Sequence, residues 1–132
     1  SDTVSSTDYL GIDGIDYDEA DKIKTSLQEK VYFDFDKSAL SNSTKEVLSK
    51  YVEESKKASI IRLEGHCDER GTREYNLALG EKRAIEVKNY LIIQGVPSSK
   101  IKIISYGEEK PISFGSTEDD WKQNRRVEIA LF

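Results

Sequence analysis

Residues 65–84, G-H-C-D-E-R-G-T-R-E-Y-N-L-A-L-G-E-K-R-A, carry the pattern that decides the fold of this chain. The apolar run at 59–65 that leads into them is typical of a β-strand, and the polar residues after it predict a loop. Thr72 is a good helix N-cap, and Gly95 followed by Pro97 is a helix stop signal. Between these signals the apolar residues fall on one helical face: Leu77, Ala84, Val87 and Leu91. The sequence therefore predicts a strand, a polar loop and a long amphipathic helix.

Outward from this unit, hydrophobic periodicity predicts further elements. Ser43 followed by Glu46 resembles a capping box, which indicates a helix from about Thr44 to Lys57. Residues 107–123 predict a loop with one helical turn near Trp121. The remaining predicted elements are strands at 31–35, 101–106 and 127–131 and a short amphipathic helix at 18–29.

The order β-α-β-α-β-loop-β predicts an α+β fold in which helices pack on a mixed four-stranded sheet. We expect parallel crossovers for the first three strands and an antiparallel last strand, because the connection before it contains little helix. Asp36, residues 66–70, Gly107 and residues 124–126 would then meet at one edge of the sheet, where ligands of open α/β sheets bind. Carboxylates and guanidiniums at one cleft would suit a zwitterionic ligand, although charged loops are usually only solvated.

Length and charge set the broad class of the protein. The chain has 132 residues, about the size of one domain, and a net charge of −5. Residues 1–30 hold eight acidic residues and three lysines, whereas the rest is balanced. We therefore expect an acidic tether at 1–29 and one folded domain at 30–132. A basic nucleic-acid footprint is excluded, and no apolar run reaches the length of a membrane span. Residues 1–6 do not resemble a signal peptide, so we expect a processed or trimmed form.

The residues do not favour an enzyme or a metal site. His66 and Cys67 are the only histidine and cysteine, and neighbours in sequence seldom form a catalytic pair. A zinc site needs three or four ligands. Glu64 and Glu69 have Arg62 and Arg70 nearby, so salt bridges are the expected arrangement rather than a glycosidase pair.

Four ordered blocks resemble the OmpA-like domain family over about residues 30–132. They are 31–37 (V-Y-F-D-F-D-K), 65–84, 105–111 (S-Y-G-E-E-K-P) and 124–128 (N-R-R-V-E). The D-E-R-G form followed by E-Y-N is similar to the peptidoglycan-associated lipoproteins of that family rather than to flagellar motor stator proteins or porin-type relatives. The resemblance implies a periplasmic βαβαβ(α)β domain that is not an enzyme and that binds the diaminopimelate of the peptidoglycan stem peptide.

The family's site residues transfer position by position. Asp68 matches the aspartate that receives the ammonium of diaminopimelate, and Arg83 matches the arginine that engages its carboxylate. Phe35 and Asp36 match the end of the first strand, which lines the pocket. Asn76 and Leu79 match nearby helix positions, and Arg125 matches the start of the last strand. The resemblance also implies a TolB-like partner of the Tol system and an outer-membrane anchor through an N-terminal lipid.

The chain departs from the family pattern at three places. Arg73 replaces a common proline, Cys67 stands where small residues such as alanine are usual, and the acylated cysteine is absent from the sequence. Two alternatives to wall binding stay open: a periplasmic protein-docking domain with a weakened wall site, and a wall-cleaving enzyme.

Overall fold

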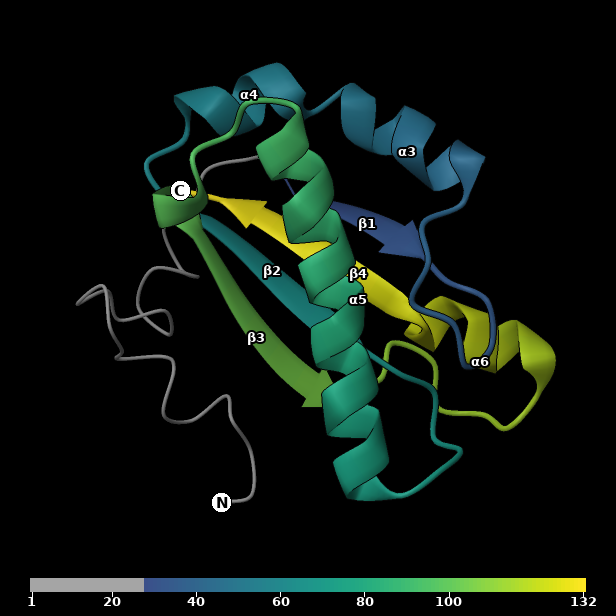
Figure 1. Cartoon of the computed structure of the whole chain (residues 1–132). Coiled ribbons are helices and arrows are strands. Elements are labelled where there is room, and N and C mark those ends of the chain that lie inside the picture. Colours follow the sequence, from purple (N-terminus) through teal and green to yellow (C-terminus); the bar gives the residue numbers. More distant parts are fainter. Residues whose placement is uncertain (1–27) are drawn as a thin grey trace.

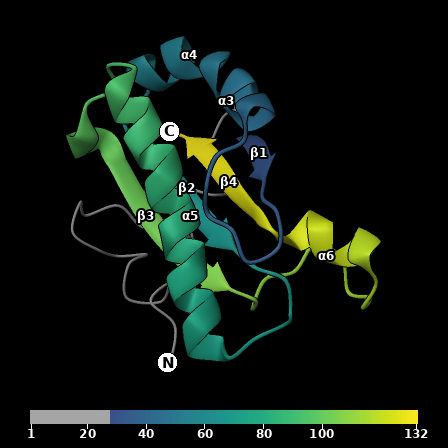
Figure 2. The ribbon, with the colours of Figure 1, turned by 45° about the vertical axis from the view of Figure 1, so that its right-hand side comes forward.

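The computed structural model describes residues 28–132, which form a four-stranded mixed sheet covered on one face by helices (Figures 1 and 2). The elements are β1 (Gln28–Tyr32), α3 (Asn42–Ser49), α4 (Val52–Lys57), β2 (Ile61–His66), α5 (Arg73–Ile93), a 3₁₀ turn (Ser98–Lys100), β3 (Ile101–Gly107), α6 (Glu118–Asn124) and β4 (Arg126–Leu131). This is the predicted α+β architecture. Residues 1–27, and with them most of the predicted helix at 18–29, lie outside the described residues, but Gln28 and Glu29 belong to β1, so the helix does not reach Glu29.

The strand order is β1-β4-β2-β3. β2 and β3 pair in parallel, and β4 pairs antiparallel with both β1 and β2. The first three strands therefore all point in one direction, as predicted, and the last strand runs against them. The last strand is inserted between the first and the second.

The core lies between the sheet and α5, α3 and α4. Ile61 and Leu63 of β2 point into it and are fully buried, whereas Arg62 and Glu64 alternate to the other side and form an ion pair of 2.7 Å. α5 approaches β2 through two glycines: a Cβ on Gly65 would lie 1.8 Å from the Gly80 carbonyl oxygen. Only glycine allows this approach, which brings the middle of α5 directly onto the sheet.

Helix α5 begins and ends where the sequence predicts. The Thr72 side chain accepts a hydrogen bond from the Tyr75 N–H, and Gly95 adopts a left-handed φ of 103° after the last turn. Both signals act locally, between residues a few positions apart. The strength of these local caps explains why the prediction was confirmed.

Three other predictions about the helices were wrong. The predicted helix at 44–57 is two helices, because Lys50 and Tyr51 donate to carbonyls three residues back and tighten the chain into a turn. The capping residue is Ser41, which accepts from the Thr44 N–H, and not Ser43. The single turn near Trp121 is a seven-residue helix, α6, which begins with a capping box between Thr117 and Asp120.

The chain leaves β1 earlier than predicted, at Tyr32 rather than at Phe35. The Phe33 N–H still donates to the Arg125 carbonyl at 3.0 Å, and Asp36 has a positive φ of 56°. The chain therefore turns away from the sheet between these residues. Phe35 and Asp36 are carried over the carboxyl edge as a result.

Candidate functional site

Six of the seven predicted site residues line one small cavity at the carboxyl edge of the sheet. The cavity has a volume of about 240 Å³. Its predicted lining residues are Phe35, Asp36, Asp68, Asn76, Leu79 and Arg83. Arg125, the seventh, is not in the lining, but its Nη1 atom lies 3.4 Å from Asp68 Oδ2. The predicted convergence of the strand ends therefore occurs.

Asp68 is the anionic centre of this cavity. Its side chain is 4% exposed and forms an ion pair of 2.8 Å with Arg70. Burial alone would raise the pKa of Asp68, but hydrogen bonds from the side chain and backbone of Arg70 and from Arg125 hold that pKa below its ordinary value. Asp68 is consequently a carboxylate at neutral pH.

Arg83 is the cationic centre, and it also holds the site together. Its fully buried guanidinium donates to the carbonyls of Lys37 at 2.8 Å, His66 at 2.9 Å and Asp34 at 3.0 Å. Burial lowers the pKa of Arg83, yet an arginine stays protonated in a protein. A guanidinium has five N–H donors, so these bonds leave two donors for a ligand in the cavity.

Asn76 shapes the loop that carries Asp68. Its amide donates to the Arg70 carbonyl at 2.9 Å and to the Glu108 carboxylate. Gly71 turns against the same amide with a φ of 100°. On the other side of the cavity the Tyr75 hydroxyl donates to Asp36. These contacts fix both loops that border the cavity.

Four lining residues were not among the predicted site residues: Cys67, Arg70, Gly71 and Tyr75. Arg70 has the strongest influence, because it binds Asp68 and its guanidinium carbon lies 4.0 Å from the ring centre of Phe35 and 3.8 Å from that of Trp121. Its position two residues after Asp68 in the same short loop was the available signal. The predicted Glu69–Arg70 pair does not form: Glu69 accepts from Ser116 and Trp121 instead.

The cavity does not present an activated nucleophile. Cys67 is buried, its thiol lies 3.2 Å from the Asn76 carbonyl oxygen, and burial raises the pKa of the thiol to about 11. Nucleophilic cysteines have lowered pKa values instead. His66 stacks on Tyr106 at 5.3 Å. Within residues 28–132 no group of three histidine, cysteine or acidic side chains could hold a metal ion.

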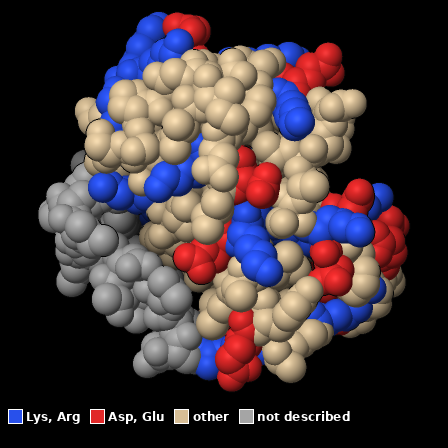
Figure 3. Space-filling model, viewed as in Figure 1, with Lys and Arg blue, Asp and Glu red and all other residues tan. Residues whose placement is uncertain are grey.

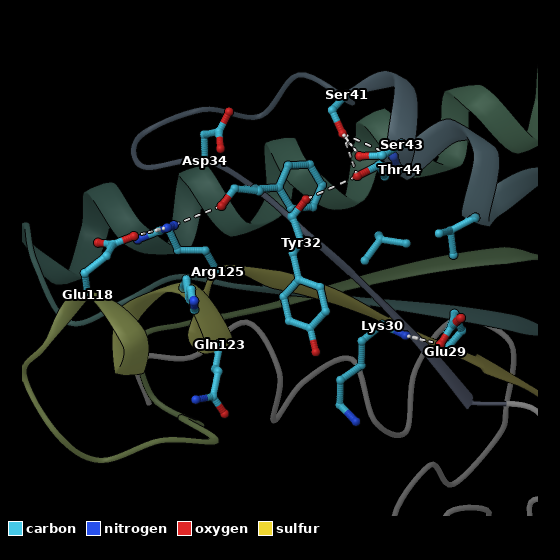
Figure 4. A pocket seen from close by; sticks show the side chains of 14 residues that line it. Glu29, Lys30, Tyr32, Asp34, Ser41, Ser43, Thr44, Glu118, Gln123 and Arg125 are labelled. Atoms are coloured by element: carbon cyan, nitrogen blue, oxygen red, sulfur yellow. Dashed lines mark hydrogen bonds and ion pairs between the residues drawn. The ribbon is translucent and has the colours of Figure 1, made fainter.

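A larger cavity of about 700 Å³ runs along the outer edge of β1 (Figure 4). Most of its lining side chains, including Lys30, Tyr32 and Gln123, are exposed. Its buried cation, Arg125, already donates to Glu118 at 2.7 Å and to the Phe33 carbonyl at 2.9 Å. The small cavity is the better candidate site, because its charged centres are both buried and turned toward the same space.

Comparison with known proteins identifies relatives of the chain. The model of the OmpA family matches residues 32–125. A peptidoglycan-associated lipoprotein of Pseudomonas putida is 46% identical over 99 residues, which are 74% of this chain and 60% of that protein. The chain thus spans about three fifths of the length of this curated relative.

Solved structures agree with the sequence comparison. The crystal structure of the peptidoglycan-associated lipoprotein from Burkholderia pseudomallei superposes with a TM-score of 0.75 at 39% identity, covering 78% of this chain and 89% of that chain. A cell wall anchor of the type VI secretion system (T6SS) from Pseudomonas aeruginosa has a TM-score of 0.67 at 20% identity, covering 88% of this chain and 92% of that one, and shares the fold alone.

Proposed function

Because this chain belongs to the OmpA family, we propose that residues 30–132 form a non-catalytic domain that binds peptidoglycan and ties the outer membrane to the cell wall. The observation that carries the proposal is that buried Asp68 and buried Arg83 line the same cavity. The relatives named above are peptidoglycan-associated lipoproteins. The mixed surface charge supports a small polar ligand rather than a polyanion, because acidic and basic side chains are interspersed over the face that carries α5 (Figure 3).

The ligand that fits this cavity is the free end of diaminopimelate in the stem peptide. That end carries an ammonium for Asp68 and a carboxylate for the remaining donors of Arg83. Leu79 and the half-exposed Phe35 offer apolar surface to the methylene groups between the charges. Each charge-assisted hydrogen bond contributes about 1.5–3 kcal/mol. Loss of either charged residue should therefore weaken binding more than loss of a charge on the surrounding surface.

We test the proposal by co-sedimentation with purified peptidoglycan. The parent protein is compared with Asp68→Asn, Arg83→Lys and a control, Lys82→Ala, which removes an exposed charge from the same helix. Circular dichroism checks that each variant folds. The parent and the control should co-sediment, and the two site variants should remain in the supernatant. If the parent stays in solution, or if the site variants bind as well as the parent, the assignment is wrong.

A second function, protein docking, is favoured by apolar side chains on the surface. Phe114 is 83% exposed and Ile112 is 40% exposed on the loop between β3 and α6. Ser116 of that loop donates to Glu69 beside Asp68, so the loop is tied to the candidate site. A TolB-like periplasmic protein of the Tol system is the proposed partner. Phe114→Ser should abolish its capture and leave wall sedimentation unchanged; retained capture would reject this loop as the docking surface.

A further inference from the structure

The carboxylate of Asp68 is already saturated by two arginines. Its Oδ1 atom accepts the Arg70 backbone N–H at 3.0 Å and Nε–H at 3.2 Å. Its Oδ2 atom accepts Arg70 Nη2 at 2.8 Å and Arg125 Nη1 at 3.4 Å. A carboxylate offers about four lone-pair positions, and these four donors use them all. An incoming ammonium can bind Asp68 only if one donor leaves.

Arg70 is the donor that can leave. The Arg125 side chain is 7% exposed and is held by Glu118 and by the Phe33 carbonyl. The Arg70 side chain is 33% exposed, and Asp68 is the one hydrogen-bond acceptor of its guanidinium among residues 28–132. The rings of Phe35 and Trp121 also contact this group, with ring centres 4.0 Å and 3.8 Å from its guanidinium carbon. Ring contacts do not depend on Asp68, so they can hold the guanidinium beside the cavity after it leaves the carboxylate.

We propose that Arg70 is a specificity-determining residue that makes the site select a ligand end carrying both an ammonium and a carboxylate. The inference rests on the proposed function. An ammonium that displaces Arg70 from Asp68 leaves a guanidinium without its anion. The ligand carboxylate that accepts from Arg83 has acceptor positions to spare and also supplies Arg70 with a new anion, whereas a ligand with an ammonium alone supplies none. Diaminopimelate has the two-charge end, and a lysine side chain has the ammonium alone.

The test compares two tripeptides, L-Ala-γ-D-Glu-meso-diaminopimelate and L-Ala-γ-D-Glu-L-Lys, by isothermal titration calorimetry. The parent should prefer the diaminopimelate peptide. Arg70→Ala and Arg70→Gln should bind the lysine peptide more tightly, and the preference should shrink by about tenfold, which corresponds to 1.4 kcal/mol. Arg73→Ala is the matched control. Arg73 carries the same charge three residues after Arg70, but its side chain pairs with Glu109 at 2.6 Å and not with Asp68. The control should retain the preference of the parent.

Trp121 gives a second readout, since it is the one tryptophan in the sequence and touches the Arg70 guanidinium. The diaminopimelate peptide should change Trp121 fluorescence in the parent and not in Arg70→Ala. If the Arg70 variants keep the preference of the parent, or lose affinity for both peptides equally, Arg70 is not the selecting residue, and the proposed wall binding by the parent still stands. A parent that binds neither peptide nor sedimented wall overturns the proposed function and this inference together.

Discussion

Replacing Arg83 by alanine should destabilise the folded domain by about 3–5 kcal/mol, because this side chain joins three segments of backbone. One of its acceptors, the His66 carbonyl, belongs to a buried residue that ends β2, and an acceptor left unsatisfied inside a protein costs about 1–3 kcal/mol. The Asp34 and Lys37 carbonyls belong to exposed residues, so water replaces part of those two bonds and each loss adds about 1 kcal/mol. The sum is a large part of the stability of a small domain.

The measurement is urea denaturation followed by circular dichroism, with Lys82→Ala as the control. Lys82 is the exposed neighbour of Arg83 on the same helix, and its loss should change the free energy of unfolding by less than about 0.5 kcal/mol. Arg83→Lys keeps one charged donor and should fall between the parent and the alanine variant. A change below about 1 kcal/mol for Arg83→Ala would refute the reasoning, because three hydrogen bonds, one of them buried, cannot be lost at so small a cost. It would also show that Arg83 serves the ligand and not the fold.

Further outcomes follow from other buried groups. Since the folded pKa of Asp68 is lowered, its stabilisation is complete above the unfolded value of about 4 and is lost as pH falls through the folded pKa. The excess unfolding free energy of the parent over Asp68→Asn should therefore shrink between pH 5 and pH 2 in denaturant titrations, and a constant difference would contradict this. Gly65→Ala places a Cβ 1.8 Å from the Gly80 carbonyl and should cost about 3 kcal/mol or more; an unchanged melting temperature would show that α5 moves away freely. Cys67, buried and with a thiol pKa of about 11, should resist iodoacetamide at pH 8 until guanidinium chloride unfolds the domain, and mass spectrometry of labelled protein would reveal any faster reaction.

The sequence predicts those structural features that depend on contacts between residues close together in the chain. The start of α5 just after Thr72 and its end just before Gly95 depend on contacts within one helical turn, and both were confirmed. The same local logic could have found α6, because Thr117 and Asp120 stand at capping-box spacing. Periodicity could not find the turn at Lys50 and Tyr51, since neither proline nor glycine marks it.

The insertion of β4 between β1 and β2 could not be predicted from local pattern. Its antiparallel direction follows from the short helix before it, but its neighbours are chosen by pairing over nearly the whole described chain, as in Tyr32 with Arg126. The same limit applies to the site. The transferred positions do line one cavity, yet the saturation of Asp68 by Arg70 and Arg125 depends on side-chain geometry that no spacing rule specifies.

The placement of β1 has a mechanical consequence for the proposed link between outer membrane and cell wall. Gln28 begins this strand at one end, and the candidate cavity lies beyond the other end. In the proposed anchor, tension between the membrane side at the first end and cell wall bound at the cavity would pull β1 lengthwise past β4. The five paired positions between the two strands then resist together in shear, rather than opening one after another from a free end. Resistance to force is set by the unfolding rate, so the domain should yield more slowly to this pull than to one that peels β1 sideways from the sheet.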